Sequence, residues 1–316
     1  MDEGFSGKLK KRRLLNRGAR IVSRFMSLTV FSVFALIFIM LFWEAFPLFL
    51  KKSLSDILLS TAWMPHSSDY GLYRFIIGSL YTTALALVIA VPLSVLTAIF
   101  LSEYLPRKIA MYTKMVFDVL SGVSPVVYGF WGILVIVPLV RGHIQPFCAK
   151  HLPWSFFTST NMSGFSVLSG SIVLALMASP LIVSISEEVL RAVPFEMRQA
   201  SMALGATRWE MIKKVLIKKA APGIIAAVIL SLSRTIGETM AVLMVAGCHI
   251  QETPFSIFDP GYPLPALIAN TFGETMSIPL YKSAIFLAAF VLLILTALSN
   301  LVGWSILVRI EEEKAS

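Results

Sequence analysis

The chain has 316 residues, of which 57% are hydrophobic and only 14% are charged, and its mean hydropathy is +0.79. Soluble domains carry about 25% charged residues, so this composition excludes a water-soluble surface and indicates a protein whose solvent is lipid. A net charge of +9 would suggest a nucleic-acid partner for a soluble protein, but here its distribution along the chain bears on membrane topology.

The chain begins with a basic stretch, residues 1–24, which we expect to be a tail outside the membrane. The apolar run that follows, from Phe25 to about Phe49, is longer than the apolar core of a signal peptide, which has about 7–15 residues. No cleavage pattern of small residues follows it. Residues 25–72 are therefore predicted to hold an uncleaved first span and an outer loop.

Five further apolar segments follow, each near the length of about 20 residues that a membrane-crossing helix needs. Glycine and proline occur within them, which spans tolerate because neighbouring helices satisfy the freed backbone groups. The sequence thus predicts an all-α polytopic membrane protein with six transmembrane helices. The five segments are approximately 75–101, 115–140, 168–186, 222–247 and 283–308.

The distribution of lysine and arginine predicts the direction of these spans. With the N-terminus in the cytoplasm, 20 of the 27 basic residues fall in cytoplasmic segments, six fall outside, and Arg234 lies in a span. Cytoplasmic loops carry an excess of positive charge. Both termini are therefore predicted to be cytoplasmic, the second as a short tail, residues 309–316.

Two connections between spans are long. The outer one, 248–282, contains proline and glycine turn signals, and its segment 264–272 is predicted to form a short apolar helix. The cytoplasmic one, 187–221, should hold a helix that begins at Pro194 and ends at Gly205, followed by an amphipathic stretch. Such a loop either lies on the lipid headgroups or docks into a partner.

The segment Arg198–Ala206, with the sequence RQASMALGA, resembles the EAA loop of ABC-importer permeases. In that family the loop forms a coupling helix that sits in a groove of the ATPase subunit. The likeness implies the type I ABC-importer permease architecture, with departures at Gln199, where glutamate is usual, and at Lys218, where proline is usual. The residues to which it assigns ATPase coupling are Gln199, Ala200, Ser201, Leu204 and Gly205.

The predicted fifth span contains an arginine near its middle, Arg234, which costs about 2.5–3.5 kcal/mol to insert. Glu238 follows four residues later, on the same face of a continuous helix, with Thr235 and Thr239 beside it. One interpretation is an internal ion pair that merely survives burial. The other is a substrate pathway for a tetrahedral oxyanion, because a guanidinium can hold two oxygens at once.

The carboxylate of Glu238 adds a hypothesis about selectivity. A carboxylate accepts a hydrogen bond from a protonated oxygen of hydrogen phosphate, whereas sulfate has no such proton at neutral pH and would be repelled. The pair Arg234 and Glu238 would therefore favour phosphate over sulfate.

The motif RTIGET at 234–239, followed by Met-Ala-Val, resembles the fifth span of phosphate ABC-importer permeases of the PstC type. Segments 78–106, 124–129 and 266–274 also resemble that family, so the likeness covers a permease domain of residues 73–308. It implies that Arg234 and Glu238 line the phosphate passage. It also implies three partners: an ATP-binding cassette ATPase dimer, a homologous PstA-type sibling permease, and an extracytoplasmic phosphate-binding protein.

No phosphate-cradling P-loop, no nucleophile elbow and no HExxH motif occurs in the sequence. We therefore expect no catalytic residue, no metal site and no cofactor of its own, with ATP bound and hydrolysed by a partner. Cys148 and Cys248 are both predicted to lie outside the cytoplasm, and whether they form a disulfide stays open.

Three alternatives remain beside a phosphate permease that works by alternating access in the inner membrane. A permease for sulfate or molybdate would share the coupling loop. An ion-coupled secondary transporter would use the same intramembrane charges, but such folds usually show inverted repeats, and none is evident among the six segments. A membrane enzyme or a purely structural subunit has no catalytic motif, or no need of Arg234, to support it.

Overall fold

The computed structural model describes residues 3–65, 68–152, 154–157, 159, 161–250, 253–275 and 278–315, the side chains of 3–17, 155, 274, 275 and 310–315 excepted. Within these ranges six helices are long and apolar enough to cross a membrane, which confirms the predicted all-α, six-span fold. The elements are α1 (Glu3–Phe49), α2 (Leu54–Leu59), β1 (Trp63–Met64), β2 (Asp69–Tyr70), α3 (Tyr73–Ile99), η2 (Phe100–Tyr104), α4 (Arg107–Ser121), α5 (Pro125–Trp131), η3 (Gly132–Ile136), α6 (Val137–Leu139), η4 (Val140–Ile144), α7 (Gln145–His151), η5 (Ser155–Phe157), α8 (Val167–Ala192), α9 (Phe195–Ala203), α10 (Arg208–Met211), η6 (Ile212–Leu216), α11 (Ile217–Ile236), α12 (Met240–Val245), α13 (Leu264–Thr275) and α14 (Pro279–Ala315).

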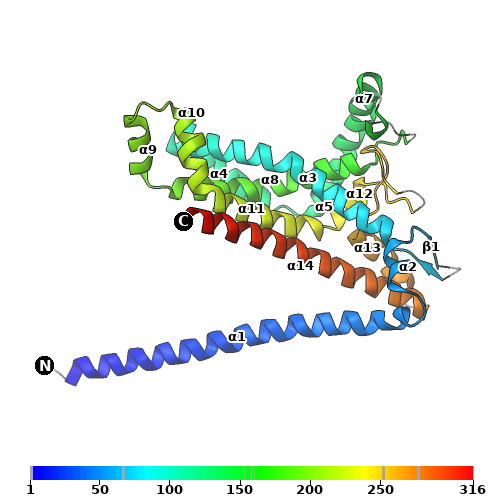
Figure 1. Ribbon diagram of the computed structural model, residues 1–316, viewed down its shortest axis with the longest axis horizontal. Helices are drawn as coiled ribbons and strands as arrows, with labels where there is room; N and C mark the ends of the chain where they lie inside the picture. Colours follow the sequence, from blue (N-terminus) through cyan, green and yellow to red (C-terminus); the bar gives the residue numbers. More distant parts are fainter. Residues whose placement is uncertain are drawn as a thin grey trace.

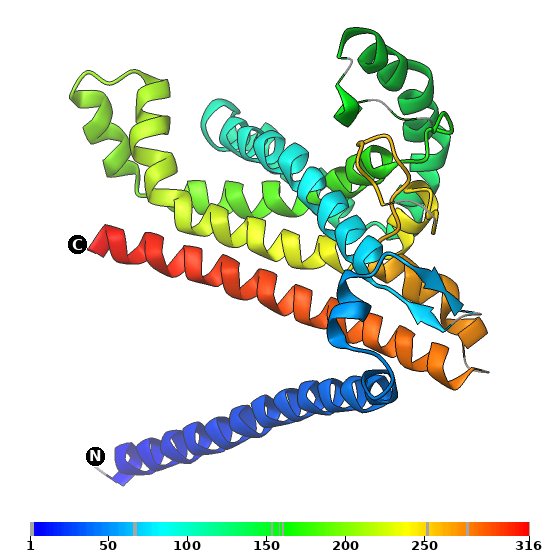
Figure 2. The ribbon, with the colours of Figure 1, turned by 45° about the vertical axis from the view of Figure 1, so that its right-hand side comes forward.

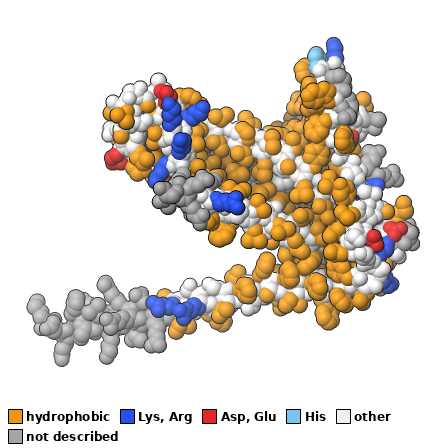
Figure 3. Space-filling view, in the orientation of Figure 1, with side chains coloured by type: hydrophobic (Ala, Val, Ile, Leu, Met, Phe, Trp, Pro, Cys, Tyr) orange, Lys and Arg blue, Asp and Glu red, His pale blue; other side chains and the backbone are white. Residues whose placement is uncertain are grey.

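The long helices run between two ends of the molecule (Figure 1). One end carries α9, α10 and both chain termini, and we call it the coupling-loop end. The opposite end carries α2, the antiparallel pair β1–β2 and α13, and we call it the hairpin end (Figure 2). Hydrophobic side chains cover the middle of the visible face, while lysines and arginines gather at the coupling-loop end (Figure 3). This distribution is that of a protein whose middle faces lipid.

Helices α3 and α8 pack along one another and form the centre of the molecule. Their contact is built from small buried side chains, among them Ala86 and Ala90 of α3 and Ala175 and Ala178 of α8. The buried Ser171 hydroxyl donates a hydrogen bond of 3.0 Å to the carbonyl oxygen of Thr82. Small residues and interhelical hydrogen bonds hold helices together in lipid, where the hydrophobic effect between helices is lost.

Helix α1 is attached to the rest of the chain mainly through α14. Near the hairpin end the Phe290 ring lies 5.0 Å from the Phe38 ring and 5.7 Å from the Phe42 ring, measured between centroids. Glu44 and Lys282 form an ion pair of 2.9 Å there. Toward its N-terminus α1 diverges from the other helices (Figures 1 and 2). The helix begins at Glu3, so the residues expected to form a tail continue directly into the first span.

The third span differs from the prediction because its helix is interrupted. Residues 107–121 form a separate helix, α4, which lies against α8. Ser124 then adopts an extended conformation with φ −60° and ψ 136°, as expected for a residue before proline, and a new helix starts at Pro125. The third span therefore covers Pro125–His151 rather than 115–140.

The fifth span also differs at both ends. Helices α10, η6 and α11 join without a break, so the span covers Arg208–Ile236 rather than 222–247. The fourth span, α8, extends to Ala192. Consequently the connection predicted at 187–221 shortens to residues 193–207, of which α9 is the helical part. The apolar helix expected at 264–272 is confirmed as α13.

Candidate functional site

The fifth span is broken three residues after Arg234. Helix α11 ends at Ile236, Gly237 follows as its cap, and a new helix, α12, starts at Met240. The amide of Glu238 donates to the carbonyl of Thr235 at 3.2 Å, which closes the last turn. The expectation that Arg234 and Glu238 lie on one face of a continuous helix is therefore wrong. Among the described residues, neither one takes part in an ion pair.

The Arg234 guanidinium is exposed and reaches toward the end of α4. Its Nη2 donates to the carbonyl oxygen of Ser121 at 3.5 Å, a long hydrogen bond. The Tyr128 hydroxyl donates to the neighbouring carbonyl of Leu120 at 3.0 Å. Arg234 thus faces the C-terminal carbonyls of α4 with most of its hydrogen-bonding capacity unused among the described residues.

The other three predicted pathway residues divide into two groups. Glu238 and Thr239 are partly exposed in the break, and the Thr239 hydroxyl donates to the carbonyl of Gly237 at 3.3 Å. Thr235 is buried, and its hydroxyl donates to the carbonyl of Ser231 at 2.8 Å within its own helix. The structure therefore brings Arg234, Glu238 and Thr239 to one interruption of the membrane helix, and it leaves Thr235 as a packing residue.

Several polar neighbours of the break were not identified from the sequence. Tyr128 and Ser121 come from the third-span region, and Asn300 of α14 is hydrogen-bonded to the Ser233 hydroxyl. The segment at 124–129 did stand out in the sequence by its resemblance to the permease family. Nothing in it indicated, however, that Tyr128 would lie near Arg234, because that proximity depends on the interruption between α4 and α5 at residues 122–124.

Two mainly apolar hollows border this region. One, of about 390 Å³, lies between α1, α14 and the break, with Gly237 and Asn300 in its lining. The other, of about 470 Å³, lies between α4, α5 and α8, with Tyr128 and Trp131 in its lining. Neither is lined by a charged side chain, so the charges that could recognise an ion are those of the break itself.

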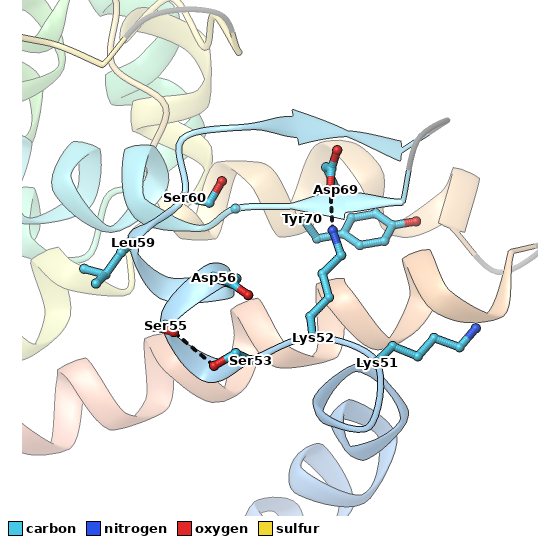
Figure 4. A pocket seen from close by; sticks show the side chains of 10 residues that line it. Lys51, Lys52, Ser53, Ser55, Asp56, Leu59, Ser60, Asp69 and Tyr70 are labelled. Carbon is cyan, nitrogen blue, oxygen red and sulfur yellow. Dashed lines mark hydrogen bonds and ion pairs between the residues drawn. The ribbon is translucent and has the colours of Figure 1, made fainter.

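A polar hollow of about 590 Å³ opens at the hairpin end, beside α2 and the β1–β2 pair (Figure 4). Its lining carries two lysines, Lys51 and Lys52, and two aspartates, Asp56 and Asp69. Lys52 and Asp69 form an ion pair across it. Because the acidic and basic charges balance, this hollow offers an anion no net attraction, unlike the break around Arg234.

Helix α9 lies at the coupling-loop end, set off from the body of the molecule (Figure 1). It begins after Pro194 and ends at Ala203, and the turn that follows includes Gly205, whose φ of +87° is the left-handed conformation that favours glycine. No residue of α9 is buried, and its apolar residues Phe195 and Met202 are exposed. Leu204, directly after the helix, is 90% exposed. Exposed apolar side chains grouped on a projecting helix mark an interaction surface.

The five predicted coupling residues all lie on this helix or at its C-terminal end. Gln199, Ala200, Leu204 and Gly205 are exposed, and Ser201 is partly exposed. The helix that follows starts with a capping box, in which Thr207 and Glu210 exchange hydrogen bonds of 3.0 and 3.3 Å. It then runs 29 residues to Ile236, a length of about 44 Å at 1.5 Å per residue. The structure therefore connects α9 to the break through one continuous helix.

Lys218, where the family usually has proline, is exposed within α11. Cys148 and Cys248 are both free thiols, so the disulfide left open by the sequence is not formed. Within the described ranges no three histidine, cysteine, aspartate or glutamate side chains are grouped as a metal ion would require.

The sequence of the chain matches a known protein family and several of its members. A model of the family described as binding-protein-dependent transport system inner membrane component matches residues 90–311. The probable phosphate transport system permease protein PstC of Methanocaldococcus jannaschii is 35% identical over 279 residues, 87% of this chain and 88% of that protein. The phosphate transport system permease protein PstC of Haemophilus influenzae is 32% identical over 295 residues, 91% of each chain.

Solved structures with a similar fold are also transporters. A chain from inward-facing conformations of the MetNI methionine ABC transporter aligns with a TM-score of 0.50 and 18% identity, over 76% of this chain and 94% of that one. A chain of a bacterial alginate ABC transporter, in complex with an alginate-bound periplasmic protein, aligns with a TM-score of 0.52 and 13% identity, over 74% and 78%. At these identities the likeness concerns the fold alone.

Proposed function

Because the chain belongs to the family of binding-protein-dependent transport system inner membrane components, we propose that it is the permease subunit of an ATP-driven importer of inorganic phosphate. The relatives named above are phosphate permeases and match nearly the whole chain. The chain would be a non-catalytic subunit, with ATP bound and hydrolysed by a partner.

One observation supports this proposal above all: α9, with its exposed apolar side chains, is followed after a short turn by one helix that runs to the break in the membrane span. The break carries Arg234, Glu238 and Thr239. A displacement of α9 by a partner is transmitted along a rigid helix to the residues that would contact the ion. Alternating access to the break, driven by closure of an ATPase dimer on α9, is the mechanism that this connection favours.

The proposal requires three partners. An ATP-binding cassette ATPase dimer would receive α9, with Leu204 and Gln199 at the contact. A homologous sibling permease of the PstA type would face the break and supply a second cation, since this chain brings only Arg234. An extracytoplasmic phosphate-binding protein would deliver the ion to the hairpin end. The coupling-loop end with both termini would then be cytoplasmic, as the excess of basic residues predicts.

Phosphate is the proposed substrate on chemical grounds as well. The guanidinium of Arg234 offers paired donors to a tetrahedral oxyanion, and its one long bond to Ser121 is weak enough to be exchanged. Glu238 can accept a hydrogen bond from a protonated phosphate oxygen but would repel an unprotonated dianion such as sulfate. A single arginine offset by a carboxylate also keeps binding weak enough for release.

The test is uptake of labelled phosphate by proteoliposomes that hold this chain with its sibling, ATPase and binding protein. We expect uptake that requires ATP on the ATPase side, is not competed by sulfate or molybdate, and falls about 30-fold in Arg234→Gln. Arg20→Gln, which removes an exposed arginine outside the break, serves as the control and should retain uptake.

Each other outcome selects an alternative. ATP-driven uptake that sulfate or molybdate competes would retain the importer and replace the substrate. Uptake that ignores ATP but collapses with an ion gradient would indicate a secondary transporter. Normal uptake by Arg234→Gln would remove the break from the pathway.

A further inference from the structure

Three arginines of the coupling-loop end converge on the last turn of the second span. This turn is η2, Phe100–Tyr104, and it carries Glu103, whose side chain is only 8% exposed. The arginines come from three separate elements: Arg191 ends α8, Arg198 lies in α9, and Arg208 begins α10. They are far from η2 in sequence, so the fold alone brings these groups together.

Each arginine makes a defined contact with η2. Arg198 Nη2 lies 3.2 Å from Glu103 Oε1 and also donates to the carbonyl of Leu190 at 2.7 Å. Arg191 donates to the carbonyl of Leu101 at 3.4 Å. Arg208 donates to the carbonyl of Glu103, and its guanidinium carbon lies 4.8 Å from the centre of the Tyr104 ring. The turn is thus bound through its backbone, its carboxylate and its aromatic ring.

The end of a helix is a natural acceptor for such groups. Its last carbonyls have no partner within the helix, and the helix dipole places partial negative charge there. Here Pro106 prevents the helix from continuing, so these carbonyls stay available. Arg191 and Arg208 therefore satisfy two of these carbonyls, which would otherwise need water, while Arg198 pairs with the Glu103 carboxylate.

Among these contacts, that of Arg198 attaches α9 to the rest of the protein. The ends of α3 and α8 pack with α10 and η6 into a buried cluster that includes Ile99, Leu190 and Ile212. Helix α9 contributes nothing to this cluster, because none of its residues is buried. Among the described residues of α9, Arg198 alone makes an ion pair or a side-chain hydrogen bond. Its side chain is 15% exposed, so the pair with Glu103 is largely shielded from water.

We infer that Glu103 is a positioning residue which binds α9, through Arg198, to the end of the second span. A displacement of α9 then moves α3 and the packed α8 directly, in addition to the helix that leads to Arg234. The inference rests on the proposed function, since it names the path by which ATPase closure reaches the membrane helices. We call the pair Glu103–Arg198 the α9 clamp.

The test compares Glu103→Gln, Arg198→Gln and the double variant in the complete reconstituted complex. Arg107→Gln is the matched control. Arg107 lines a hollow of about 260 Å³ together with Glu103 and Arg198, but it makes no ion pair or hydrogen bond with the described residues. The readout is the ratio of phosphate transported to ATP hydrolysed. A general loss of stability lowers the number of active complexes but does not change this ratio. We expect this ratio to fall about fivefold or more in both single variants, the lower range for coupling between two sites.

The double variant should be no worse than either single one, since both remove the same contact. A ratio equal to that of the control, or additive losses in the double variant, would overturn the inference. If Glu103→Gln does not assemble with the ATPase, Arg198→Lys decides, because it keeps the charge and loses the forked geometry. An intermediate ratio in Arg198→Lys supports the clamp, and a normal ratio contradicts it.

A second measurement separates this inference from the proposed function. Hydrogen exchange of the α9 amides, 195–203, should be about tenfold faster in Glu103→Gln than in Arg107→Gln, as for a segment that opens locally. If the wild-type complex shows no ATP-driven phosphate uptake, the proposed function fails, but the difference in exchange rate between the two variants still tests the clamp. If exchange is unchanged, the clamp is wrong whatever the complex transports.

Discussion

The charged groups at the two ends of the helix Arg208–Ile236 are arranged in opposite ways. At the coupling-loop end two carboxylates are buried and paired, Glu103 with Arg198 and Glu187 with Lys114 and Arg191. At the break, Arg234 and Glu238 are more exposed and have no ion-pair partner among the described residues. Paired and buried charges hold this protein together, whereas the unpaired charges are available to a ligand or another chain.

Glu187→Gln should have the largest effect on stability. The Glu187 side chain is 2% exposed, and its loss removes the carboxylate paired with Arg191 and the nearer carboxylate, at 3.3 Å, of Lys114. We expect the free energy of unfolding to fall by about 3 kcal/mol, the lower end for broken buried pairs because both cations are partly exposed. Denaturant unfolding of the purified chain in detergent measures it. Glu188→Gln is the control, since Glu188 is 76% exposed and 3.8 Å from Lys114. Equal losses in both variants would contradict the comparison.

Arg234→Gln should show the reverse pattern. Among the described residues its one side-chain hydrogen bond is the long bond to Ser121, so the free energy of unfolding should change by less than about 0.5 kcal/mol. Phosphate uptake should fall about 30-fold, corresponding to about 2 kcal/mol of lost charged hydrogen bonds to the ion. Unfolding and uptake measured on the same preparation check both parts. A strongly destabilised variant would mean that Arg234 is a structural residue like Arg198.

Glu238→Gln should alter selectivity more than rate. The amide has nearly the shape of the carboxylate but carries no charge and can donate a hydrogen bond, so sulfate would no longer be repelled. We expect the preference for phosphate over sulfate to fall about tenfold in competition uptake assays. Unchanged competition by sulfate would exclude Glu238 from ion recognition.

Gly205→Ala should have the smallest effect. The φ of +87° at this position strains an alanine, although no atom lies within 4 Å of the added methyl group. The cost should be about 1 kcal/mol, expressed as fraying of the end of α9 and weaker copurification with the ATPase. Gly142→Ala is the control, because Gly142 has equal space and no left-handed conformation. A control that weakens copurification equally would refute the role of the turn.

The sequence predicted well those features that depend on composition and local pattern. The six spans follow from apolar length, the short helix α13 from an apolar run after prolines, and the turn at Gly205 from a glycine that ends a helical pattern. The exposed apolar end of α9 also agrees with a loop too long and too amphipathic for a simple connection.

The interruptions of spans were not predicted, because hydropathy reports where a segment lies rather than whether its backbone is continuous. Residues 222–247 are mostly apolar apart from the motif, yet the helix ends at Ile236. Residues 115–140 likewise hide the turn before Pro125. The contacts of Arg234 with Ser121 and of Arg198 with Glu103 join distant segments, and no local pattern in the sequence encodes them.

The attachment of α1 bears on how the protein is made. Its main contacts are with α14, so a helix made early in this chain packs against one made more than 200 residues later. Until α14 has been synthesised and inserted, Phe38 and Phe42 lack the Phe290 ring against which they pack, and lipid or an insertion factor must shield them. A nascent chain that stops before Phe290 therefore exposes an unpaired aromatic helix, which quality control in the membrane can recognise as incomplete.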